Sequence, residues 1–116
     1  MALVGRIRRM DQVEAVIREK VLRFYEFARQ SLAIRKVLVY GSYAKGHAAP
    51  DSDIDVAVVV DEPNHARRIE ITAKLFHWAF QVDPAIEPKC VFWDEYESHD
   101  KASILSEIIQ TSVEIV

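Results

Sequence analysis

The sequence reads Gly41-Ser42-Tyr43-Ala44-Lys45-Gly46 and, after a short connection, Ser52-Asp53-Ile54-Asp55-Val56, and this stretch decides the fold. The segment just before it, 36–40, is short and rich in β-branched residues, which predicts a strand that ends at Gly41. The segment 54–60 is apolar apart from Asp55, which predicts a central strand covered on both faces. Small residues and Pro50 between these strands predict a connection that contains a short helix after Ser42.

Two carboxylates begin the second strand. Side chains alternate along a strand, so Asp53 and Asp55 point to the same side, while Ile54 between them faces the core. Two carboxylates on one side repel each other, and each then favours its neutral form. A divalent cation removes that conflict, and Mg²⁺ suits carboxylate oxygens combined with waters and substrate phosphates. The spacing therefore indicates a metal-binding pair.

Gly41 and Ser42 follow a predicted strand and open a predicted helix. Glycine permits close approach of the backbone, and the start of a helix presents free N–H groups, so a phosphate fits there. Each half of this pattern is weak evidence alone. A carboxylate pair beside a phosphate cradle is the layout for phosphoryl or nucleotidyl transfer.

Further from this stretch, the spacing of apolar residues predicts helices and strands in alternation. We expect an N-terminal helix over about 10–31, a second helix over 63–80, a strand over 86–93, an acidic turn over 94–100, a helix over about 101–111 and a last short strand over 113–116. Pro88 predicts that the strand over 86–93 lies at an edge or carries a bulge. The expected buried stripes are Val13, Val16, Ile17, Val21, Phe24, Phe27 and Ala28 in the first helix and Ile69, Ala73, Phe76 and Phe80 in the second. The order predicts an α/β (α+β) fold with a small mixed sheet flanked by helices.

Length and composition bound the class of protein. A chain of 116 residues, half of them hydrophobic and 28% charged, is expected to form one globular domain over 1–116, with a core region over about 36–93. Cys90, the single cysteine, cannot form an internal disulfide and is expected to be buried and inert. No apolar run is long enough to cross a bilayer or to form a signal peptide, so we expect a soluble cytoplasmic protein.

Charge is unevenly divided along the chain. Residues 1–50 carry ten basic and four acidic side chains, whereas residues 51–116 carry five basic and fourteen acidic ones. The split indicates either a basic surface beside an acidic pocket or ordinary solvated helix faces.

The string Gly41-Ser42-x-Ala44-x-Gly46 followed by Ser52-Asp53-Ile54-Asp55 resembles the signature of the DNA polymerase β-like nucleotidyltransferase superfamily. Its closest resemblance is to the minimal nucleotidyltransferases, which are stand-alone domains of about this length. The resemblance implies that Gly41 and Ser42 hold the phosphates of ATP or another nucleoside triphosphate. It also implies that Asp53 and Asp55 bind two Mg²⁺ ions.

The resemblance further implies a third carboxylate from a neighbouring strand. Glu87 matches best, as a metal ligand or as the base that deprotonates the attacking hydroxyl, and Asp83 is the alternative. A glutamate in place of the more usual aspartate leaves the metal geometry open. Lys45 either adds positive charge near the triphosphate or is a solvated lysine. The reaction implied is transfer of a nucleotide, AMP by default, to a hydroxyl with loss of pyrophosphate.

The acceptor is not specified by the residues. Minimal members of the superfamily resemble antitoxins paired with a small helical HEPN toxin, and some transfer AMP to a tyrosine of that partner. The resemblance thus implies a protein adenylyltransferase whose partner is a HEPN-type protein, with no requirement for nucleic acid or membrane. Two alternatives stay open. One is a non-catalytic antitoxin that neutralises its partner by contact. The other is an enzyme that acts on a small molecule or RNA end, with a homodimer completing the substrate site.

Overall fold

The computed structural model describes residues 15–46, 48–49, 51–100 and 103–116. In chain order the elements are α2 (Ala15–Ala28), β1 (Ile34–Tyr40), α3 (Ser42–Lys45), β2 (Ile54–Val60), a 3₁₀ turn (His65–Arg67), α4 (Arg68–Val82), β3 (Ile86–Phe92), α5 (Trp93–Glu97), α6 (Ile104–Thr111) and β4 (Val113–Glu114). The expected residues 10–14 of the N-terminal helix and 101–102 of the C-terminal helix lie outside the described residues. The predicted strands and the short helix after Gly41 are confirmed.

Within the described residues, four strands form one mixed sheet in the order β3-β2-β1-β4. β1 is antiparallel to both β2 and β4, whereas β2 and β3 are parallel. Every residue of β2 is buried except Asp55, as expected for a central strand covered on both faces. β3 lies at an edge, which confirms the inference from Pro88, since proline cannot donate a hydrogen bond to a further strand.

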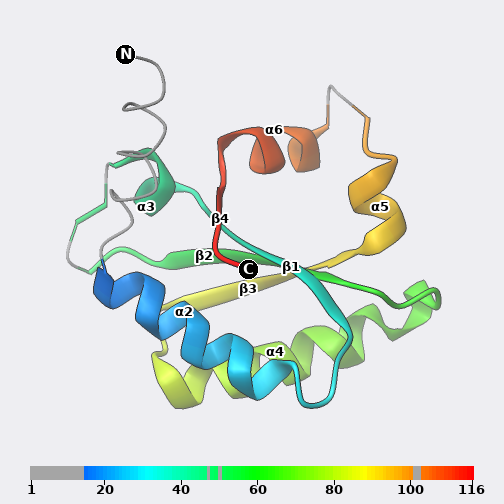
Figure 1. Cartoon of the computed structure of the whole chain (residues 1–116), viewed down its shortest axis with the longest axis horizontal. Coiled ribbons are helices and arrows are strands. Elements are labelled where there is room, and N and C mark those ends of the chain that lie inside the picture. The colour runs from blue at the N-terminus through cyan, green and yellow to red at the C-terminus, as the bar shows by residue number, and fades with distance from the viewer. Residues whose placement is uncertain (1–14, 47, 50, 101–102) are drawn as a thin grey trace.

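Helices cover the two faces of the sheet unequally (Figure 1). α2 and α4 lie together on one face, and the main core between them and the sheet includes Phe24, Val56 and Leu75, all fully buried. α5 and α6 lie on the opposite face over a smaller cluster that includes Leu38, Val59 and Ile108. α5 and α6 cover this face only from Ala57 onward and leave Asp55 uncovered. The end of the sheet where β1 ends and β2 and β3 begin is therefore open to solvent on this face.

The expected buried stripe of α4 is wrong. Ile69, Phe76 and Phe80 are 85%, 46% and 71% exposed, and Ala73 is exposed as well. The residues that α4 buries are Ile71, Leu75 and Ala79. The helix carries two apolar rows whose centres lie about 130° apart around its axis, and the row with the smaller side chains faces the sheet and α2, where close packing favours it. The same error affects Val16 and Phe27 of α2, which are 50% and 40% exposed.

The expected acidic turn over 94–100 is in part the helix α5. Glu95 explains this difference, because its carboxylate accepts a hydrogen bond from the Phe92 backbone N–H at 3.0 Å and so caps the helix start. α6 begins later than expected, at a Ser103 cap whose Oγ accepts from the Ser106 N–H at 3.1 Å. Cys90 is buried and free, as expected. None of the described helices combines the length and the hydropathy that a bilayer span requires.

Candidate active site

Three polar side chains lie in one row across the open end of the sheet. Tyr40 of β1 is paired in register with Asp55 of β2, and Asp55 is paired in register with Glu87 of β3. Directly opposed residues of neighbouring strands project to the same face of a sheet. The strands therefore bring Asp55 and the expected third carboxylate, Glu87, side by side with a phenol.

Gly41 packs its backbone against the Asp55 carboxylate. It precedes the short helix α3 with φ 74° and ψ −149°, a conformation that is essentially confined to glycine. A methyl group at this position would lie 2.3 Å from Asp55 Oδ2. Glycine is therefore required here for two reasons, the backbone conformation and the space that the carboxylate occupies.

Asp53 lies just before β2 and is exposed, while Ile54, the residue between the two aspartates, is 1% exposed in the core. Partial burial, the Glu87 carboxylate and the Asp53 carboxylate, in that order, raise the pKa of Asp55. Burial and the charges of Asp55 and Glu87 likewise raise the pKa of Tyr40. The site thus concentrates negative charge that is not balanced within the row itself, which favours the binding of a cation.

The donor set fits a divalent cation only in part. Within 15–46, 48–49, 51–100 and 103–116, no three His, Cys, Asp or Glu side chains are arranged to hold an ion by themselves. Mg²⁺, however, usually takes one or two protein carboxylates and completes its shell with waters and substrate phosphates. Asp55 and Glu87, with Asp53 beside them, suit an ion that is also held by a bound nucleotide.

The row opens into a cavity of about 340 Å³. Tyr40, Asp55 and Glu87 line one part of it, and the rest is lined by Arg68, Thr72 and Phe76 of α4 and by Pro88, Lys89 and Cys90 of β3. Arg68 is held in place because it donates to the Cys90 carbonyl at 2.8 Å and pairs with Glu95. The carboxylates therefore face a solvent-accessible space that a substrate can enter from the β3 edge.

Besides Gly41, Ser42 was expected to hold the phosphates, and Lys45 either to add charge there or to be solvated; both lie in α3, which follows Tyr40 and Gly41. Ser42 is half-buried at the first position of α3, directly after Gly41, and Lys45 is exposed in its last turn. Their roles toward a triphosphate remain predictions. Tyr43 of α3 is 8% exposed and belongs to the core cluster, with its hydroxyl 3.4 Å from the Ala49 carbonyl.

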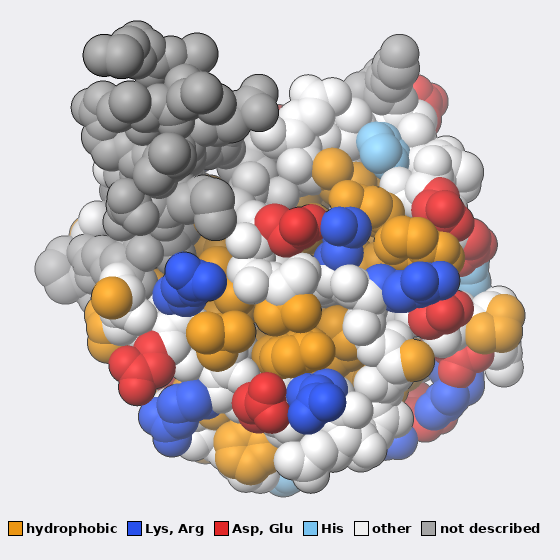
Figure 2. Space-filling model, in the orientation of Figure 1, with side chains coloured by type: hydrophobic (Ala, Val, Ile, Leu, Met, Phe, Trp, Pro, Cys, Tyr) orange, Lys and Arg blue, Asp and Glu red, His pale blue; other side chains and the backbone are white. Residues whose placement is uncertain are grey.

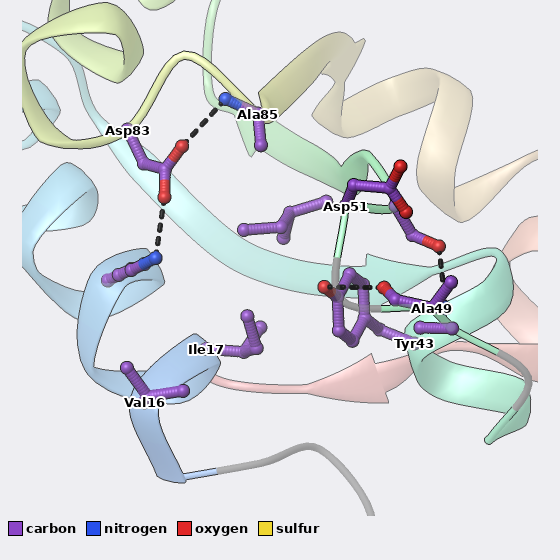
Figure 3. Close-up of a pocket in the computed structure, with 11 residues that line it drawn as sticks. Val16, Ile17, Tyr43, Ala49, Asp51, Asp83 and Ala85 are labelled. Carbon is purple, nitrogen blue, oxygen red and sulfur yellow. Dashed lines mark hydrogen bonds and ion pairs between the residues drawn. The ribbon is translucent and has the colours of Figure 1, made fainter.

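Asp83 lies in a different cavity, of about 390 Å³, bordered by α2, the segment before β2 and the turn before β3 (Figure 3). Its carboxylate accepts from Lys20 Nζ at 2.6 Å and from the Ala85 N–H at 2.8 Å. The Lys20 hydrogen bond, followed by that of Ala85, lowers the pKa of Asp83. Asp83 thus links α2 to the end of α4, whereas Glu87 is the acidic residue in register with Asp55.

Sequence reasoning missed the part of this site that comes from Tyr40 and α4. Tyr40 could have been found, because it directly precedes Gly41 at the end of a predicted strand. If that strand pairs with 54–60 so that Tyr40 lies opposite Asp55, both side chains project to the same face of the sheet. Arg68, Thr72 and Phe76 could not, since the expected burial of Phe76 assigned the wrong face of α4 to the core.

The surface does not separate into a basic and an acidic region on the face shown in Figure 2, where basic and acidic side chains are interspersed around apolar areas. Several of the charges are paired, for example Lys36 with Glu114 at 2.7 Å and Arg35 with Asp61 at 3.3 Å. On this face the pattern agrees with solvated helix faces rather than with a single-sign field.

Comparisons with known proteins agree with this arrangement. The family described as "Polymerase beta, Nucleotidyltransferase" matches residues 23–116. No curated protein sequence matches the chain. Among solved structures, the crystal structure of a toxin–antitoxin with AMP-PNP matches with a TM-score of 0.51 and 21% identity, over 85% of this chain and 72% of that chain. The structural match establishes a shared fold, and the family match covers both aspartates, Gly41 and Glu87. The chain therefore belongs to the polymerase beta nucleotidyltransferase domain family.

Proposed function

We propose that this protein transfers AMP from ATP to a hydroxyl group of a partner protein, with release of pyrophosphate, and that it acts as the antitoxin of a toxin–antitoxin pair. The observation that carries the proposal is the register pairing of Asp55 with Glu87 beside Gly41. The structurally similar toxin–antitoxin with AMP-PNP supports both an adenine nucleotide and a toxin partner. The HEPN class of that partner is our hypothesis.

The roles of the residues follow from their positions. Asp55 is fixed by Gly41 and partly buried, so it suits a metal ligand whose position must not vary. Asp53 is exposed and suits a second ligand shared with the nucleotide phosphates. Mg²⁺ bound there, as two ions, would stabilise charge on the phosphates and lower the pKa of the attacking hydroxyl. Ser42 and Lys45 are proposed to contact the triphosphate.

Glu87 is proposed to receive the proton of the acceptor. It is exposed in the cavity at the β3 edge, the side from which an acceptor can enter. The acceptor oxygen bonds to the α-phosphorus as the bond from that phosphorus to the bridging oxygen of pyrophosphate breaks. The hydroxyl proton passes to Glu87 and then to solvent. Tyr40, whose pKa is raised, remains a neutral hydrogen-bond donor beside the carboxylates.

The test is incubation of the purified chain with [α-³²P]ATP, Mg²⁺ and the protein encoded by the adjacent gene. Label on that protein, lost in Asp53→Asn and Asp55→Asn, is the expected result. Neutralisation of toxicity that survives both substitutions would instead support an antitoxin that acts by contact. The charge concentration at Asp55 favours chemistry, since a surface used only for contact gains nothing from adjacent like charges.

A further inference from the structure

α4 presents a second apolar row to solvent. Ile69, Ala73, Phe76 and Phe80 are spaced by four, three and four residues, which places them on one face of the helix, and we call this set the α4 stripe. Ile69 and Phe80 are 85% and 71% exposed, and Phe76 is 46% exposed. Single exposed apolar residues are common, but a row of large ones along a helix indicates a surface that another molecule covers.

The α4 stripe continues into the candidate active site. Phe76, its third member, lines the same cavity as Asp55 and Glu87. Thr72 and Arg68, on the preceding turns of α4, line that cavity too. The stripe and the carboxylates lie on opposite faces of the sheet, and the cavity connects them around the β3 edge, so a molecule on the stripe reaches the carboxylates by extending past that edge.

The stripe is too long and too apolar for a small acceptor. Ile69 and Phe80 are eleven positions apart in the sequence, and at 1.5 Å per residue they lie about 16 Å apart along the helix axis. Nucleic acid is also disfavoured, because the basic residues of α4 and of the turn before it are already paired, which leaves Lys89 at the cavity as the described cation near the stripe that forms no ion pair. Arg67 pairs with Glu62 and Glu70, and Lys74 pairs with Glu70 at 3.2 Å. A backbone of phosphates would need cations that are free to pair with it.

A second copy of this chain is disfavoured by the position of Phe76. Stripe-to-stripe packing about a two-fold axis would place Ile69 against Phe80 and Ala73 against Phe76 of the other copy. This would cover Phe76, one wall of the cavity that holds Asp55 and Glu87, in both copies. An arrangement of this kind would leave the stripe unavailable to an acceptor.

We propose that the α4 stripe is the docking surface for the acceptor protein, which lays an apolar helix face on Ile69 and Phe80 and presents a side-chain hydroxyl to Asp55 and Glu87. This inference rests on the proposed function and identifies the surface that selects the acceptor. Docking along α4 brings the hydroxyl to the β3 edge, where the new bond to the α-phosphorus forms and pyrophosphate leaves.

The experiment labels the soluble proteins of the source cell with [α-³²P]ATP, Mg²⁺ and the full chain, and compares wild type with Ile69→Asp/Phe80→Asp. Neither residue lines the cavity, so binding of Mg²⁺–ATP, measured by calorimetry, should stay within twofold of wild type. The matched control is Phe27→Asp, which alters an exposed phenylalanine that belongs to α2 and does not line the cavity. Circular dichroism melts verify that each variant folds.

We expect the stripe variant to label the acceptor protein at least tenfold more slowly than wild type, and Phe27→Asp to label it at the wild-type rate. Equal labelling by the stripe variant would overturn the docking surface and leave the proposed function intact. Label found only on a small molecule or on RNA would overturn the protein acceptor but not the transferase. A wild-type dimer that the stripe variant dissociates without slower labelling would identify a second copy as the occupant. No label on any molecule would overturn the proposed function itself.

Discussion

Gly41→Ala is the substitution that most directly tests the site. The added methyl would lie 2.3 Å from Asp55 Oδ2, whereas non-bonded heavy atoms rest about 3.5 Å apart. The carboxylate must then move by about 1 Å, and a displacement of that size can lower the rate by on the order of 100-fold. The backbone conformation adds a loss of about 1–3 kcal/mol in the free energy of unfolding.

Gly46→Ala is the matched control. Gly46 ends the same short helix with φ 76° and is exposed, so alanine there also meets a left-handed backbone and loses about 1–2 kcal/mol of stability. It lies at the other end of α3 from the contact with Asp55. Pyrophosphate release from ATP is measured well below both melting temperatures, so that only folded protein is compared. If Gly41→Ala retains activity within threefold of Gly46→Ala, the close contact does not position the carboxylate and the reasoning fails.

Three further predictions follow from the same structure. Glu87→Gln should lower the rate of transfer by about 10²–10⁴-fold, whereas Asp83→Asn should leave that rate within twofold of wild type. Both rates are measured as pyrophosphate release. Equal losses in the two variants would contradict the assignment of Glu87 as the residue that receives the proton. The pKa of Asp83 is lowered in the folded state, so its pair with Lys20 stabilises the fold at pH values above the unfolded pKa of about 3.9. This contribution to the free energy of unfolding is up to about 1 kcal/mol. It is lost as the pH falls through the folded pKa of Asp83. Urea unfolding at pH 7 and pH 3 should therefore show a smaller pH effect in Asp83→Asn than in wild type. Leu75→Ala should lower the free energy of unfolding by about 2–5 kcal/mol, because Leu75 is fully buried. Phe80→Ala should lower it by less than about 0.5 kcal/mol, because Phe80 is exposed. The reverse order would place the other face of α4 in the core.

The strands were the predictable part of this fold. The run 54–60 is apolar and rich in β-branched residues, which predicts a strand. The predicted strands before and after it are marked by a glycine at the end of the first and a proline within the other. The parity of Asp53 and Asp55 then indicated a carboxylate pair without any knowledge of the sheet order. The alternation of side chains along one strand could not identify the residue opposite Asp55 on the neighbouring strand. The register that places Glu87 there depends on how the chain passes through α4 into β3 at the sheet edge.

The buried face of α4 was not predictable from periodicity alone. Ile71, Leu75 and Ala79 form one apolar row, and Ile69, Phe76 and Phe80 belong to another. Hydrophobicity favours the row with the phenylalanines, whereas packing between two helices and a sheet favours the smaller one. Only tertiary contact decides between them, and the row that was left outside became the α4 stripe.

The position of Asp55 within β2 reflects a balance between rigidity and solvation. The next residue on the same face, Ala57, is 1% exposed and lies beneath α5 and α6 in the smaller cluster. A carboxylate there would lose its hydration with no partner, at a cost of several kcal/mol. The preceding residue on that face, Asp53, lies outside the strand and is exposed, so it is less firmly held. Position 55 is the deepest point at which this strand can hold a charge and still leave it open to a cation. The partial cover of the sheet by α5 and α6 is therefore a condition for the chemistry, since one more turn of helix over that end would bury the row of Tyr40, Asp55 and Glu87.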